Sequence, residues 1–168
     1  MDYVTKATNR SVLRRLAIRF RKICKAPLTG SFPVLNALEI LPDIFPGSVY
    51  TIVEDDELPP KTMAQCVFNE FGGFTVEIKE SVYKGAYEHN VGALRGFICH
   101  EMCHVFLFEE GFKPIKEIEG VSKNEVPAYQ SVEWQAKALC AEVMVPYEES
   151  KGMKIKDIVE KYLIQIIY

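Results

Sequence analysis

The residues of this chain most capable of chemistry form the pentapeptide His100-Glu101-Met102-Cys103-His104. On a helix, residues four apart project from one face, so both imidazoles can reach a single metal ion. Glu101 is rotated by about 100° from His100, which would bring its carboxylate beside that ion, where it could hold and deprotonate a water. The spacing therefore predicts a zinc-dependent peptidase centre with His100 and His104 as ligands and Glu101 as general base.

A catalytic zinc ion normally has three protein ligands, so a third must come from elsewhere in the chain. Glu109 and Glu110 follow on the same predicted helix, but off the histidine face or a turn too far along. His89 falls in a predicted loop before the helix. Glu133, near the start of the next predicted helix, is the better candidate, although the helix dipole alone also favours an acid there. The residues alone support the ligand and the helix-terminal acid about equally.

The surrounding sequence predicts the two helices that this chemistry needs. Residues 94–108 are rich in apolar side chains and contain no proline, and Asn90 and Gly111 are candidates to begin and end that helix. Ser131 is a good N-cap for a second helical run over residues 132–145. Small or flexible side chains on the second run would let the two helices pack closely.

The rest of the sequence contains short strand-like runs and further helices. Alternating or β-branched patterns predict three strands, at residues 48–53, 63–68 and 74–78. Helical patterns cover about residues 9–25, 33–41 and 155–162. Three short strands in succession favour antiparallel pairing, so we expect an α+β fold of helices packed with a small, mainly antiparallel sheet. We expect one domain over residues 1–168, with an N-terminal helical part (1–45) and a part containing the sheet and motif helices (46–168).

Charge is distributed unevenly along the chain. Residues 1–25 contain eight basic residues against Asp2 alone, a charge of +7, so the whole-chain charge of −3 leaves −10 for the remainder. The first helix could bind an acidic or phosphorylated partner with its basic face. Amphipathic helices with solvated charges are common, which favours a helix docked on the core. Direct nucleic-acid binding is not expected, because the remainder of the chain is acidic.

The cysteines and the apolar runs indicate the cellular compartment. No apolar run approaches the roughly 18 residues that a membrane span needs, and no signal-peptide pattern opens the chain. The five cysteines are odd in number and scattered, which predicts reduced thiols in a cytoplasmic protein. Cys99, Cys103 and Cys140 are candidates for redox control near the motif, but packing as small apolar residues is the better-supported interpretation.

Two segments resemble a known family. Residues 96–105, which contain the pentapeptide, and residues 133–146, which read E-W-Q-A-K-A-L-C-A-E-V-M-V-P, resemble the ImmA/IrrE family of metallopeptidases. In that family an H-E-L-G-H helix is followed by a helix reading like E-W-Q-A-N-x-F-A-A-E-L-L-M-P. Residues 81–86 and 32–35 are also similar to the family's upstream segments. Met102-Cys103 stands where the family has Leu-Gly, and no departure removes a ligand or the general base.

The resemblance implies a zincin-like minimal metallopeptidase in which the third ligand is Glu133. The bound ion would be Zn²⁺, with Mn²⁺ also suited to a His-His-Glu site. The implied substrate is a helix-turn-helix transcriptional repressor, often encoded beside the peptidase on a phage or mobile element. The alternative is a catalytically weak or inactive metal-binding partner of a regulator, as in toxin–antitoxin-like pairs. The candidates for stabilising the oxyanion are Tyr83, Tyr87, His89 and Arg95.

Overall fold

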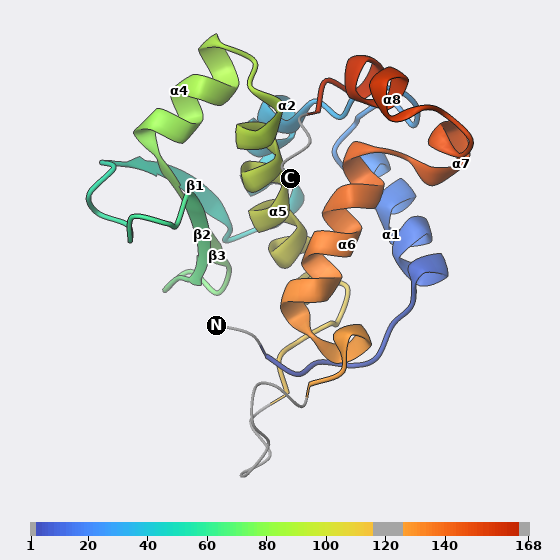
Figure 1. The fold of residues 1–168 in the computed structure, drawn as a ribbon. Coiled ribbons are helices and arrows are strands. Elements are labelled where there is room, and N and C mark those ends of the chain that lie inside the picture. Colours follow the sequence, from blue (N-terminus) through green and yellow to red (C-terminus); the bar gives the residue numbers. More distant parts are fainter. Residues whose placement is uncertain (1–2, 116–125, 165–168) are drawn as a thin grey trace.

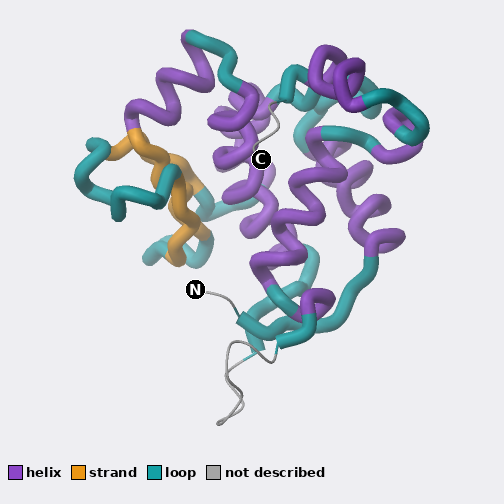
Figure 2. The backbone as a smooth tube through the Cα atoms, in the orientation of Figure 1, coloured by secondary structure: helices purple, strands orange, loops and turns teal. Residues whose placement is uncertain are grey.

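The protein is described by a computed structural model that covers residues 3–115 and 126–164 (Figure 1). Before the sheet come the helices α1 (Arg10–Ile23), α2 (Val34–Glu39) and α3 (Leu41–Ile44). The strands are β1 (Val49–Val53), β2 (Ala64–Phe68) and β3 (Phe74–Lys79). After the sheet come α4 (Glu80–Glu88), α5 (Gly92–Glu109), the 3-10 helix η2 (Ala128–Gln130), α6 (Val132–Met144), α7 (Tyr147–Ser150) and α8 (Ile155–Tyr162). The fold is α+β, as the sequence predicts, and the strands occupy one side of a largely helical molecule (Figure 2).

The sheet is mixed, so the prediction of a mainly antiparallel sheet is wrong. Its strand order is β1-β3-β2, with β3 parallel to β1 and antiparallel to β2. Only β2 and β3 are joined by a tight turn, and the longer connection after β1 carries the chain past the position that β3 later fills. Gly47, with φ of +86°, and Gly73 allow close backbone contact there, since a Cβ on Gly73 would lie 2.4 Å from the carbonyl carbon of Gly47. This contact sets the start of β1 beside the turn into β3.

Helix α5 lies at the centre of the molecule. It packs against β2 and β3 on one side and α6 on another, and α6 in turn packs against α1 (Figure 1). Its buried residues point in several directions, which explains why the sequence of α5 is apolar nearly all round. They include Ile98, Cys99, Met102, Cys103, Val105 and Phe106, each 0% exposed.

Helices α1 and α6 each begin at a side chain that caps the first turn. The Asn9 side chain accepts a hydrogen bond from the Val12 amide at 3.0 Å, and Ser131 accepts one from the Trp134 amide at 3.0 Å. Each cap satisfies an amide that the first helical turn leaves without a partner. The apolar face of α1 is buried, with Leu13 and Phe20 both 0% exposed. The first helix is thus docked on the core, as predicted.

The junction between α4 and α5 differs from expectation. Residues 80–88, for which no helix was predicted, form α4, and Val91 rather than Asn90 is the N-cap of α5. Asn90 adopts a left-handed φ of +53°, which turns the chain between the two helices. Gly85 is unfavourable in a helix, but a Cβ there would lie 2.3 Å from Cδ1 of Leu94, so a larger residue would require the Leu94 side chain to move.

The length and hydropathy of the described helices decide whether any could span a lipid bilayer. None of them alone is long and apolar enough to cross a membrane. Taken together, α4 and α5 are long and apolar enough to cross a membrane, but the two helices are bent by 119° at the break between them.

Candidate metal centre

Three predicted ligands converge where α5 and α6 pack together. Nε2 of His100 and Nε2 of His104 are 3.1 Å apart, and the Glu133 carboxylate oxygens lie 3.4 Å and 3.1 Å from them respectively. Ligands at about 2.0–2.1 Å from a tetrahedral zinc ion are separated from one another by about 3.3 Å. The separations between the two nitrogens, and between each nitrogen and one of the two Glu133 oxygens, are therefore close to those around a single tetrahedral ion, and the donor set fits zinc. The group could hold a metal ion.

The position of Glu133 depends on the segment that precedes α1. Val4 forms a β-bridge with Ser131, the Thr5 amide donates to the Gln130 carbonyl at 2.9 Å, and the Val132 amide donates to the Tyr3 carbonyl at 3.0 Å. These bonds fix the first turn of α6, which carries Glu133 one residue further on. The third ligand is thus held by contacts that link distant parts of the sequence.

Electrostatics favour an ionised Glu133. Hydrogen bonds with His100 and His104 hold the pKa of its carboxyl well below the usual range, although burial opposes this. The side chains of His100, His104 and Glu133 are 17%, 15% and 34% exposed, so solvent can reach them. An ionised, partly accessible carboxylate beside two imidazoles is a suitable ligand set for a divalent ion.

Glu101 lies on the neighbouring face of α5, in a more buried setting. Burial raises the pKa of its carboxyl to about 7, while His100 and a backbone hydrogen bond from Cys66 oppose that rise. A carboxyl group that titrates near neutral pH can both accept a proton and return it. Glu101 therefore has the acid–base properties that the sequence analysis required of a general base.

A cleft of about 610 Å³ opens over these residues, between β2 on one side and α5 and α6 on the other. His100, Glu101, His104 and Glu133 all line it. Aromatic rings form an apolar wall, with the centroid of Phe108 5.2 Å from Phe68 and 5.0 Å from Phe74. The cleft thus combines a candidate metal group, an acid–base group and an apolar surface.

Several residues weighed from the sequence lie elsewhere. None of the four oxyanion candidates is among the described residues that line the cleft. Tyr83 and Tyr87 stack on each other along α4, with ring centroids 6.1 Å apart, and the His89 side chain is 72% exposed at the end of that helix. Arg95 is buried and donates to the carbonyl of Leu163. His89 is not the third ligand of this group. Among the described residues, only Glu133 lies close enough to both His100 and His104 to share a metal ion with them.

Tyr3 and Gln135 also line the cleft. Tyr3 lines the cleft because its segment pairs with the start of α6, and no local pattern indicates a pairing across that sequence distance. Gln135 also lines it, and its amide nitrogen donates to the carbonyls of Lys6 and Tyr129, both at 2.9 Å. The sequence shows only a glutamine within a mostly apolar helical run, and the structure shows that it is fully buried, where an amide needs partners.

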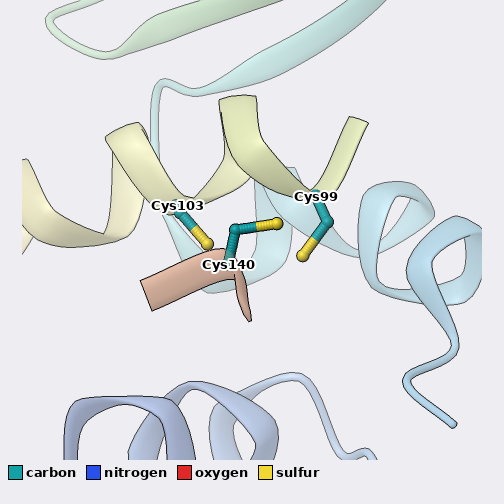
Figure 3. A group of neighbouring side chains, drawn as sticks. All are labelled: Cys99, Cys103 and Cys140. Atoms are coloured by element: carbon teal, nitrogen blue, oxygen red, sulfur yellow. The ribbon is translucent and has the colours of Figure 1, made fainter. Parts of the chain in front are cut away.

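A second group of metal-binding side chains lies on the same two helices. The sulfur atoms of Cys99, Cys103 and Cys140 all lie within 4.8 Å of one another, and this group could also hold a metal ion (Figure 3). All three are free thiols.

Comparisons with known proteins do not identify a relative. No protein-family model, curated protein or solved structure matches this chain. The ImmA/IrrE resemblance therefore stays a prediction from the sequence.

Proposed function

We propose that this protein is a metal-dependent endopeptidase in which His100, His104 and Glu133 hold Zn²⁺ or Mn²⁺ and Glu101 is the general base. One observation carries the proposal. The two histidine nitrogens lie 3.1 Å apart, each within 3.4 Å of a Glu133 carboxylate oxygen, in a cleft of about 610 Å³ that also contains the buried carboxyl group of Glu101. A metal-storage or purely structural site would need neither the cleft nor Glu101.

The chain's own residues divide the work of hydrolysis. A zinc ion bound to the three ligands would supply Lewis acidity and a water whose pKa falls to about 7. Glu101 accepts the proton of that water and delivers it to the leaving amine, a role that suits a pKa of about 7. Hydrogen bonds with both histidines lower the pKa of Glu133 in the metal-free protein, and the resulting carboxylate would offset part of the charge of a bound ion.

Among the described residues, no strand pairs with the outer edge of β2, so this edge is suited to holding an extended peptide. The Asn69 amide donates a hydrogen bond to the Gly73 carbonyl, and the Met63 carbonyl accepts one from the Lys79 amide. In an antiparallel pair such bonds occur at every second residue, so the residues of β2 between them direct their amides and carbonyls away from β3. The hydrogen bond from the Cys66 backbone to Glu101 agrees with that direction. A substrate segment added antiparallel or parallel to this edge would lie along the cleft with its backbone beside Glu101.

The resemblance to ImmA/IrrE peptidases adds a substrate class, a helix-turn-helix repressor acting in the cytoplasm. An unfolded or extended linker in such a repressor would fit the β2 edge better than a folded helix, because edge pairing needs exposed backbone groups. The alternative, a metal-binding partner that does not hydrolyse the repressor, predicts the same complex without cleavage.

The test combines cleavage with metal content. Wild-type protein, Glu101→Gln and the control Glu109→Gln are each co-expressed, in medium that contains zinc, with a repressor encoded beside the gene. The zinc content of each protein is measured, and new termini of the repressor are mapped by mass spectrometry. Glu109 is exposed on the same helix, outside the cleft. We expect cleavage by the wild type and by Glu109→Gln, with the rate for Glu101→Gln lower by about 10²–10⁴ and its zinc retained.

Two outcomes contradict the proposal. Equal cleavage by Glu101→Gln would remove the general base from the mechanism. No cleavage by zinc-loaded wild type, in a stable complex with the repressor, would establish the non-hydrolytic alternative.

A further inference from the structure

The three thiols repeat the geometry of the histidine group on the buried side of α5. Cys99 and Cys103 are four residues apart on α5, as His100 and His104 are, and Cys140 of α6 completes the group as Glu133 completes the other. Figure 3 shows the three side chains directed toward a common point between the two helices. Each cysteine of α5 immediately precedes a histidine, so the two groups are separated by a rotation of about 100° around the same helix.

The surroundings of the thiols differ from those of the histidines. Cys99 and Cys103 are both 0% exposed, and Cys140 is largely covered, with its sulfur 3.6 Å from the Gly96 carbonyl oxygen. Within residues 3–115 and 126–164, no fourth Cys, His, Asp or Glu belongs to the group. An ion held there would have sulfur ligands only and little access to water.

These two facts restrict the chemistry of the ion. Thiolate sulfur selects soft ions such as Cu(I) and zinc, but protein-bound zinc almost always takes four ligands. Cu(I) is stable with three. With metal–sulfur bonds of about 2.3 Å, three sulfurs in a plane around an ion are separated by about 4.0 Å. The sulfurs here lie within 4.8 Å of one another, so less than an ångström of side-chain movement would close the site.

We propose that Cys99, Cys103 and Cys140 form a three-sulfur site for Cu(I), distinct from the His100–His104–Glu133 group. On binding, each coordinating thiol loses its proton to solvent and forms a sulfur–copper bond. Copper stays monovalent throughout, so no oxidant or reductant is consumed. The ion would tie α5 to α6 beside the catalytic ligands. The site does not depend on the proposed peptidase activity.

The test uses zinc-saturated, fully reduced protein under anaerobic conditions, so that copper is offered the thiols alone. Cu(I) is supplied as its complex with a chromophoric chelator, which reports transfer to the protein, and X-ray absorption identifies the ligand atoms. The variants are Cys103→Ala and Cys140→Ala. The matched control is Cys24→Ala, because Cys24 is a buried thiol, 5% exposed, outside the group.

The wild type and Cys24→Ala should each take one copper ion per chain, with three sulfur neighbours and no nitrogen. Cys103→Ala and Cys140→Ala should bind Cu(I) more than about a hundredfold more weakly, since even the partners of metal ligands are worth ten- to a hundredfold. Nitrogen neighbours in the wild type, or undiminished affinity in Cys140→Ala, would overturn the proposal. So would wild-type protein that takes no copper from the chelator. The absorption measurement needs only the wild type, so a variant that fails to fold does not prevent a decision.

Discussion

The interface between α5 and α6 contains two groups of candidate metal ligands that differ in donor type and in exposure. His100, His104 and Glu133 face a cleft and remain 15–34% exposed, whereas Cys99 and Cys103 are completely buried. A rotation of one residue along α5 separates them, because consecutive side chains on a helix point about 100° apart. Nitrogen and oxygen ligands beside a cleft suit an ion that meets a substrate, while sulfur ligands inside the core suit an ion that does not. One pair of helices thus offers two chemically different environments within a single interface.

The largest expected effect is on zinc affinity, when neighbouring residues of the two groups are substituted one at a time. His104→Ala removes one of three ligands and should weaken zinc binding by more than about a hundredfold, with loss of hydrolysis. Cys103→Ala, one residue earlier, should leave zinc affinity unchanged because its side chain lies on the buried side. Competition with a zinc chelator and elemental analysis measure both. If Cys103→Ala also loses zinc, the two groups act as a single site and the comparison fails.

The dependence of stability on pH tests how deeply the carboxyl group of Glu101 is buried. Burial raises the pKa of Glu101 from 4.5 to about 7 in the folded protein. Folding therefore favours the protonated form, and the metal-free protein should lose stability as pH rises from about 4.5 to about 7. The loss relative to Glu101→Gln should reach at most about 3.5 kcal/mol, since the pKa rises from 4.5 to about 7 and one pKa unit corresponds to about 1.4 kcal/mol. Urea unfolding of both proteins at pH 4.5, 6 and 8 measures the difference. Parallel stability curves for the two proteins would contradict the buried position of the carboxyl group.

The smallest effect is expected at the centre of the pentapeptide. Met102 is 0% exposed and points into the core rather than into the cleft. Met102→Leu should change the free energy of unfolding by less than about 1.5 kcal/mol and leave zinc binding unchanged, because the swap nearly conserves volume. Chemical denaturation and zinc titration test this. A large drop in zinc affinity would mean that Met102 supports the ligand geometry directly.

Local patterns predicted the parts of the site that lie within single helices. The four-residue spacing of the histidines and the Ser131 cap are properties of short segments, and the structure has both on helices. The parallel pairing of β1 with β3 was missed because it joins two strands that are not consecutive in the chain, which no local periodicity reveals. Helix α4 was missed because Gly85 lowers local helix propensity, while its packing against Leu94 is tertiary. Tyr3 belongs to the cleft only through pairing with a distant helix.

That pairing has a consequence for synthesis on the ribosome. The segment at Val4 and Thr5 hydrogen-bonds with residues around 130, which are translated long after it. A nascent chain that ends before α6 contains both histidines and Glu101, but it has neither Glu133 nor the bonding partners of its own early segment. Completion of the candidate centre must therefore wait until most of the chain has emerged. The topology therefore delays assembly of the candidate metal centre until α6 has been synthesised.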